Sequence, residues 1–244
     1  MRNIKLTLSY DGTEYLGFQR QAFGRTIQGT IELALKRLLN EEVNLIGCSR
    51  TDAKVHAKEY IANFITESSI PEDRFCYAIN TKLPDDIVIC KSEEVSLNFH
   101  SRYGCRGKTY IYTILNAEMP RPIFRNYHYY HKNKLDVSLM ESAAGFFIGE
   151  KDFSAFKSAG SAAKSNVRDV KELKVYKAGD YIKVQVTANG FLYNMVRIIC
   201  GTLVLAGEKK ISPEYIKTII RDKDRKMAGM VLPPQGLCLD KVYY

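Results

Sequence analysis

The chain has 244 residues, of which 45% are hydrophobic and 26% are charged, which argues against bulk disorder and allows one large domain or two smaller ones. Lysine and arginine number 36 and aspartate and glutamate 27, so the net charge is +9. A charge of this sign favours a polyanionic partner such as RNA or DNA, although a basic protein without nucleic acid would have the same composition.

The cysteines are scattered and form neither a CxxC pair nor a zinc-ligand pattern with histidine. They stand at positions 48, 76, 90, 105, 200 and 238. This pattern predicts free thiols in a reducing compartment. There is no apolar signal core and no apolar run long enough to span a membrane, so we expect a cytoplasmic protein without membrane association.

The first hundred residues alternate between strand and helix patterns. Residues 4–10 alternate apolar and polar side chains and predict a strand, and residues 27–39 have helical spacing behind Thr26, a suitable N-cap. A polar loop follows at 47–56. A strand is expected at 61–66, a helix beginning at Pro71, and a short strand at 87–90.

A second series begins near Cys105. Strands are predicted around residues 109–115, at 170–177 and at 181–188, the last two joined by a turn at 178–180. Asp136 is expected to cap a helix that carries Phe146 and Phe147. Further helices are expected at 194–206 and around 216–220, and a final strand at 237–243.

This order predicts an α+β fold with two pseudo-related halves around a largely antiparallel sheet. We place the boundary so that residues 1–103 form the N-terminal half and residues 104–244 the C-terminal half. No low-complexity linker separates them, and we expect the active-site cleft between them.

The segment Gly47-Cys48-Ser49-Arg50-Thr51-Asp52-Ala53-Lys54-Val55-His56-Ala57 carries most of the functional information. By residue type alone, an aspartate after threonine in a polar loop is most often a turn former or a helix cap. The segment, however, resembles the signature of the tRNA pseudouridine synthase A family, whose usual form is Gly-Arg-Thr-Asp-Ala-Gly-Val-His-Ala. Asp52 falls on the position of that family's catalytic aspartate.

The resemblance extends over almost the whole chain and keeps the family's order. The matching blocks are Tyr10-Asp11-Gly12-Thr13 with Gln19-Arg20-Gln21, Thr26-Ile27-Gln28-Gly29, Leu83-Pro84-Asp85-Asp86-Ile87, Phe99-His100-Ser101-Arg102 with Lys108, Tyr110 and Tyr112, Asp152-Phe153, Gly190 to Arg197, and Pro233-Pro234 with Gly236. A series of this kind is far more specific than a single motif.

The resemblance implies isomerisation of uridine to pseudouridine in the tRNA anticodon stem-loop, at tRNA positions 38, 39 and 40. It assigns catalysis to Asp52 and Arg197, places Tyr110 against the target base, and gives Arg50 the role of holding the flipped nucleotide. Burial alone would favour the neutral form of an aspartate, and a guanidinium such as that of Arg197 would oppose this. Without the family context, Tyr110 would be an ordinary strand tyrosine and Arg50 an ordinary phosphate-contacting loop arginine.

The implied reaction exchanges no electrons and loses no group, so we expect no cofactor and no metal. The histidines at 128 and 131 are the one pair close enough in sequence to share a metal site, and no carboxylate stands near them in the sequence. The family also implies a homodimer that binds tRNA. Basic residues flanking the matched blocks are candidate phosphate contacts, namely Arg20, Arg25, Lys54, Lys58, Arg106 and Lys108.

Ser49 and Lys54 both stand where the family usually has glycine, which permits positive φ and close backbone approach. These changes leave alternatives open. The protein could be a pseudouridine synthase for ribosomal or another RNA, or a non-catalytic RNA-binding protein or chaperone. The presence of Asp52, Tyr110 and Arg197 together argues against loss of catalysis.

Overall fold

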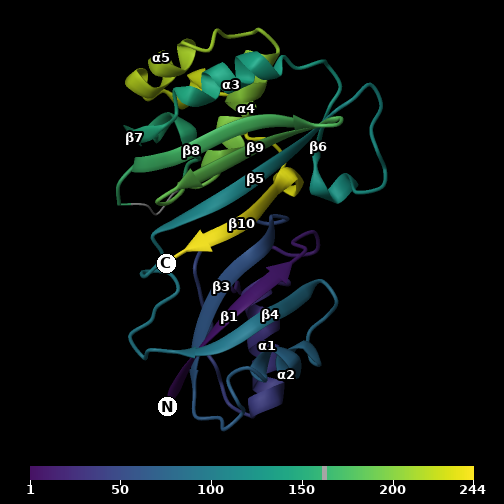
Figure 1. The fold of residues 1–244 in the computed structure, drawn as a ribbon, viewed down its shortest axis with the longest axis vertical. Helices are drawn as coiled ribbons and strands as arrows, with labels where there is room; N and C mark the ends of the chain where they lie inside the picture. The colour runs from purple at the N-terminus through teal and green to yellow at the C-terminus, as the bar shows by residue number, and fades with distance from the viewer. Residues whose placement is uncertain (161–163) are drawn as a thin grey trace. The chain divides into compact units, whose positions relative to one another are not determined.

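The computed structural model describes residues 1–160 and 164–244. The chain forms two compact units (Figure 1). Unit 1 contains Met1–Arg106 and Cys238–Tyr244, and unit 2 contains Gly107–Leu237. The sequence prediction divides the chain at residue 103 and leaves the C-terminal residues in the second half. The structure assigns them to unit 1 because the last strand pairs with a strand of that unit, Cys238 opposite His56.

Unit 1 contains a sheet with the strand order β4-β1-β3-β10, and β2 also pairs with β3. All of these pairs are antiparallel except β3 with β10. Two helices lie against one face of the sheet (Figure 1). The elements are β1 (Arg2–Tyr10), α1 (Ile27–Leu39), β2 (Ile46–Gly47), β3 (His56–Thr66), α2 (Phe75–Asn80), β4 (Ile87–Val95) and β10 (Leu237–Tyr243).

Unit 2 contains a sheet with the order β5-β9-β8-β7, in which every pair is antiparallel, and β6 pairs in parallel with β5. Its elements are β5 (Gly107–Asn116), β6 (Tyr129–His131), α3 (Val137–Gly145), β7 (Gly149–Asp152), β8 (Val167–Ala178), β9 (Tyr181–Ala188), α4 (Met195–Gly207) and α5 (Tyr215–Asp222). Single 3-10 turns occur at Arg125–Tyr127, Ser154–Phe156, Arg225–Met227 and Pro234–Gly236.

Local sequence patterns account for the elements that were predicted correctly. Ile4, Leu6 and Leu8 of β1 are fully buried, as the alternation requires. Thr26 caps α1 by accepting a hydrogen bond from the Gly29 backbone N–H, and Asp136 caps α3 in the same way. The α+β class with largely antiparallel pairing is therefore confirmed.

Several boundaries differ from the prediction. β3 begins at His56 and β4 continues to Val95, because both strands are paired with β1 well beyond their apolar cores. α2 begins at Phe75, since Pro71 initiates only a turn whose carbonyl accepts from Arg74. α3 ends at Gly145, which leaves Phe147 buried beyond the helix. Within the described ranges, no helix has the length and apolar character needed to span a membrane.

Candidate active site

Asp52 lies half-buried in the loop that joins β2 to β3 in unit 1. The backbone of this loop is held by the segment that follows β1. Phe18 donates its N–H to the carbonyl of Thr51 at 3.1 Å, and Lys54 donates to the carbonyl of Tyr15 at 3.1 Å. Two main-chain hydrogen bonds thus flank Asp52, one on either side, and fix the backbone of the residue that is predicted to be catalytic.

Two glycines allow these segments to approach so closely. Gly17 has φ of 102°, and a Cβ there would lie 2.6 Å from the carbonyl oxygen of Thr51. A Cβ on Gly12 would lie 2.1 Å from the carbonyl oxygen of Val55. Neither position can accept a side chain unless the Asp52 loop moves.

Side chains add further anchors to the same loop. The Tyr10 hydroxyl and the Thr51 hydroxyl share a buried hydrogen bond of 2.8 Å. The Gly12 N–H donates to Nδ1 of His56 at 3.1 Å. Sequence reasoning assigned no role to Tyr10 or His56, although both lie in segments that resemble family blocks.

Arg50 is exposed two residues before Asp52 and lines a cavity of about 220 Å³ in unit 1. The structure thus places Arg50 and Asp52 on one loop. Tyr110 and Arg197 belong to unit 2.

Tyr110 lies on β5, opposite Val186 of β9. Its side chain is buried, and its ring meets that of Phe191 edge-on, with centroids 5.0 Å apart and an interplanar angle of 83°. Phe191 belongs to the same Gly190 to Arg197 block as the candidate arginine. The ring contact therefore ties two of the matched blocks together within unit 2.

Arg197 lies in the first turn of α4 and is half-buried. Its Nε donates to the carbonyl of Leu232 at 2.7 Å, and a terminal nitrogen donates to the side-chain oxygen of Asn194 at 2.6 Å. The Asn194 amide in turn donates to the hydroxyl of Ser158 at 2.9 Å. The guanidinium is thus oriented by a backbone carbonyl and an anchored amide.

Burial raises the pKa values of two groups near Arg197, those of Tyr112 and Cys200. Tyr112 is buried on β5, its hydroxyl donates to the carbonyl of Pro233 at 2.7 Å, and burial raises its pKa well above the usual value. Burial likewise raises the pKa of the Cys200 thiol on α4. Both groups remain neutral at physiological pH, so the positive charge of Arg197 has no anionic neighbour in either of them.

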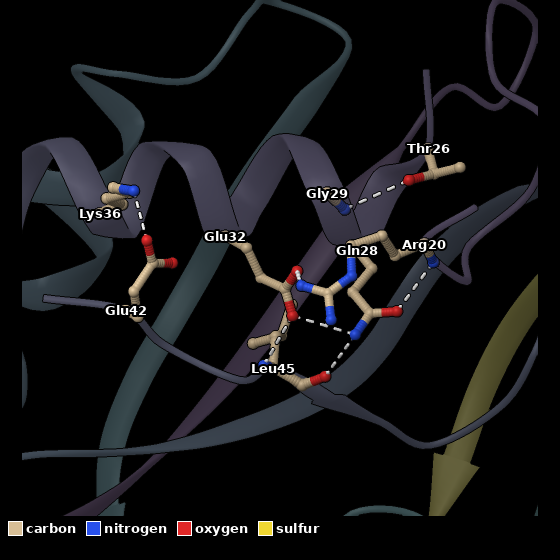
Figure 2. Close-up of polar contacts among 8 residues, drawn as sticks. All are labelled: Arg20, Thr26, Gln28, Gly29, Glu32, Lys36, Glu42 and Leu45. Atoms are coloured by element: carbon tan, nitrogen blue, oxygen red, sulfur yellow. Dashed lines mark hydrogen bonds and ion pairs between the residues drawn. The ribbon is translucent and has the colours of Figure 1, made fainter. Parts of the chain in front are cut away.

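Three of the candidate phosphate contacts are paired with carboxylates in unit 1. Arg25 lies 3.1 Å from Asp86, and Lys58 lies 3.3 Å from Asp240. Arg20 lies 2.9 Å from Glu32, as Figure 2 shows. These pairs reduce the charge that each cation presents to an outside anion.

The Arg20 pair has a structural function as well. The Glu32 side chain is only 8% exposed and accepts hydrogen bonds of 3.0 Å from the Leu45 N–H and from the Gln28 amide (Figure 2). A buried carboxylate needs such donors and a nearby cation. Arg20 therefore helps to stabilise the end of the segment that leads to β2.

The remaining candidates differ in exposure. Lys54 and Arg106 are exposed, whereas Lys108 is buried on β5 with 9% of its surface accessible. Among the described residues, no group of three or more His, Cys, Asp or Glu side chains could hold a metal ion. His131 lies 3.4 Å from Glu208, a carboxylate that the sequence spacing did not place near it.

A family model described as tRNA pseudouridine synthase matches residues 7–104 and 143–244. The chain belongs to this family. It is 53% identical to tRNA pseudouridine synthase A 2 of Clostridium perfringens and 50% identical to tRNA pseudouridine synthase A of Acetivibrio thermocellus, each over 100% of both chains. A crystal structure of a Cbf5-Nop10-Gar1 complex matches 96% of this chain and 57% of that one at 14% identity, with a TM-score of 0.36, and adds nothing to the assignment.

The two departures from the synthase signature have different structural consequences. Lys54 has φ of 64°, in the left-handed region that favours glycine. Ser49 is not among the residues with positive φ, and its N–H donates to the hydroxyl of Tyr60 at 3.2 Å. The family's glycine is therefore explained by backbone conformation at position 54, whereas position 49 accepts serine without strain.

Lys54→Gly is expected to raise the free energy of unfolding by up to about 1 kcal/mol, because glycine adopts the left-handed conformation without a Cβ clash. Ser49→Gly is expected to lower it by about 0.4–1 kcal/mol, because glycine gains freedom in the unfolded chain and relieves nothing in the folded one. Urea denaturation of both variants measures these differences. A loss of stability in Lys54→Gly would contradict the conformational explanation.

Proposed function

We propose that the protein isomerises uridine to pseudouridine in the anticodon stem-loop of tRNA. The observation that carries the proposal is a family match over the whole chain. Asp52 stands where the family signature has its catalytic aspartate, which supports the proposal. Relatives that are about half identical over their whole length are named tRNA pseudouridine synthase A.

The reaction breaks the bond between uracil N1 and ribose C1′ and joins C5 to C1′. A proton leaves C5 and N1 gains one, so neither composition nor oxidation state changes. An ionised carboxylate is the group that this chemistry requires, and Asp52 supplies it from a loop that is fixed by main-chain hydrogen bonds. Fixed placement matters because small displacements of a reacting group lower rates steeply.

Arg197 is proposed as the active-site cation and Tyr110 as the residue that lies against the target base. Support for Arg197 comes from its orientation by Leu232 and Asn194, which holds the guanidinium in one direction. Support for Tyr110 comes from its place in the matched block and from its contact with Phe191. We also propose a cytoplasmic homodimer, for which sedimentation at micromolar concentration is the test of assembly.

Arg50 is proposed to hold the target nucleotide after it leaves the base stack, a step that costs a few kcal/mol. Arg50→Ala should therefore lower the rate of pseudouridine formation at limiting tRNA by about 10-fold or more, because each 1.4 kcal/mol of lost binding is tenfold. The melting temperature should stay close to that of the wild type, since the side chain is exposed. An unchanged rate with native tRNA would contradict the role.

The exposed basic residues are proposed to contact phosphates, and Arg106 is the clearest case to test. A phosphate contact releases a condensed counterion, so Arg106→Ala should reduce the slope of log affinity against log salt by about 1. Lys171, an exposed lysine of unit 2 that pairs with Asp169, provides a matched control in Lys171→Ala. If the wild type and Arg106→Ala had equal slopes, Arg106 would not contact a phosphate.

The function itself is tested by mapping pseudouridine after incubation with unmodified tRNA and with unmodified ribosomal RNA. Signal in the anticodon arm of tRNA supports the proposal. Signal in ribosomal RNA alone keeps the chemistry and changes the substrate. Absence of signal in both RNAs overturns catalysis and favours RNA binding without reaction.

A further inference from the structure

The cavity beside Arg50 has a composition that the isomerisation chemistry does not explain. Its lining residues all belong to unit 1, it measures about 220 Å³, and it is partly open to solvent. The lining residues that matter here are Phe18, Gln28, Arg50, His100, Arg102 and Tyr103. Asp52 is not among the lining residues, so the cavity is separate from the reacting carboxylate.

One wall is an exposed aromatic surface. The Tyr103 side chain is 79% exposed, although a tyrosine of its size usually buries most of its ring. The His100 ring lies against it with centroids 4.3 Å apart, and the Arg102 guanidinium lies 6.0 Å from the ring centroid. An exposed aromatic ring with a cation nearby is a surface on which single-stranded nucleic-acid bases stack.

This wall is held in place by hydrogen bonds to the backbone. Nδ1 of His100 accepts from the backbone N–H groups of Arg102 and Tyr103, both at 3.2 Å. Ser101 is fully buried, and its carbonyl accepts from the Tyr244 hydroxyl at 2.6 Å. The loop therefore presents Tyr103 without further ordering, which lowers the entropic cost of binding.

The cavity also contains the aromatic ring of Phe18, which stacks on Tyr60 with centroids 4.4 Å apart and an interplanar angle of 21°. Next to it, position 47 can only be glycine, because a Cβ there would lie 2.4 Å from the Phe18 ring. The lining thus combines an aromatic ring with polar side chains, which suits a flat, polar ring.

The charges around the cavity select an anion. Its lining includes Arg50 and Arg102 and no aspartate or glutamate. Neither arginine has an ion pair among the residues that the structure describes, in contrast to Arg20, Arg25 and Lys58. Uncompensated guanidinium groups beside an aromatic wall match a phosphate joined to a base.

We propose that this cavity binds one unstacked RNA nucleotide next to the target uridine, with its base against Tyr103 and its phosphate near Arg50 and Arg102. The size is below the roughly 300–1,000 Å³ of pockets for drug-sized ligands and suits a single base. The inference rests on the proposed function, because it takes RNA as the substrate. It assigns the enzyme a second base-binding site beside the catalytic one.

The experiment measures the affinity of an anticodon stem-loop RNA for the Asp52→Asn protein, so that turnover does not interfere. A series of RNAs carries a single abasic nucleotide at each loop position around the target. Each RNA is titrated against proteins that also carry Tyr103→Ala or Tyr103→Phe. Tyr77→Ala is the matched control, because Tyr77 is 66% exposed in the same unit, has the Arg74 guanidinium 5.8 Å from its ring centroid, and lies outside the cavity.

Loss of one stacked base should weaken binding roughly 5- to 100-fold in Tyr103→Ala, and Tyr103→Phe should stay within about 2-fold of the parent protein. At one loop position, an abasic nucleotide should lower the affinity of the parent protein by a similar factor. The same RNA should bind the Tyr103→Ala protein no more weakly than the intact RNA does. The proposal would be overturned if, at every loop position, the affinity lost through the abasic nucleotide simply added to the affinity lost through Tyr103→Ala. It would also be overturned if Tyr103→Ala weakened binding no more than Tyr77→Ala does.

The outcome is independent of the catalytic assay. If the wild-type protein forms no pseudouridine in any RNA but the coupling between Tyr103 and one base is found, the nucleotide site stands and the proposed reaction fails. If pseudouridine forms in the anticodon arm but no coupling is found, the reaction stands and the nucleotide site fails.

Discussion

Asp52→Asn is expected to lower the rate of pseudouridine formation by at least about 1,000-fold while the protein still folds and binds tRNA. Asparagine has nearly the shape of aspartate but carries no charge and accepts no proton at neutral pH. The loop that carries the residue is held by hydrogen bonds of Phe18 and Lys54 backbone groups, and these do not involve the Asp52 side chain. Single-turnover kinetics and tRNA affinity, measured in parallel, separate the chemical step from binding.

Asp73→Asn is the matched control for this change. The Asp73 side chain is 71% exposed and lies 3.6 Å from Nε of the neighbouring Arg74. We expect this variant to react at the wild-type rate. Turnover by Asp52→Asn above about one hundredth of the wild-type rate would show that the carboxylate is not essential, since general acid–base groups contribute about 100-fold or more.

Gly17→Ala is expected to lower the free energy of unfolding by about 2–4 kcal/mol, because alanine is strained at φ of 102° and its Cβ would press on the Thr51 carbonyl. The contact can be relieved only if the Asp52 loop moves. Even where the variant is fully folded, we therefore expect the rate to fall by about 100-fold, the size of effect that a displacement of 1 Å can cause. Urea denaturation and single-turnover kinetics at low temperature measure the two effects.

Gly179→Ala separates backbone strain from the contact. Gly179 lies in the turn between β8 and β9 with φ of 62°, and nothing lies within 4 Å of a Cβ built there. It should lose only about 1 kcal/mol of stability, the cost of the left-handed conformation, and retain its activity. If Gly17→Ala behaved like Gly179→Ala in both measurements, the close approach of Gly17 to the Asp52 loop would not explain the effect.

Local patterns were sufficient to predict most helices and strands, because caps and alternation act within a few residues. Thr26 and Asp136 cap the helices that their sequence positions indicate. The sequence did not predict β6, which is three residues long and pairs with Ile114–Asn116 of β5. Such a strand is defined by a partner distant in sequence and has no periodicity of its own.

In the candidate site, too, local sequence features could be predicted, whereas contacts between segments distant in sequence could not. The sequence predicts a catalytic role for Asp52 from one motif and its resemblance, and the structure places it half-buried in a loop. The contacts that hold Asp52 and Arg197 could not be predicted, because they join the former to the segment around Gly17 and the latter to Leu232. Charge alone also gave Arg20 and Arg106 the same expected role, whereas the structure pairs Arg20 with a nearly buried glutamate.

The parallel pairing of β10 with β3 has a consequence for how the protein is made. A ribosome synthesises Met1–Arg106 before unit 2, but unit 1 also contains Cys238–Tyr244, which follow unit 2 in the sequence. Until these residues are synthesised, the edge of β3 at His56 has no β10 beside it, and the Ser101 carbonyl lacks the hydrogen bond from Tyr244. All residues of unit 2 are therefore synthesised before those of unit 1 are complete, which departs from the usual N-terminal-first order of co-translational folding.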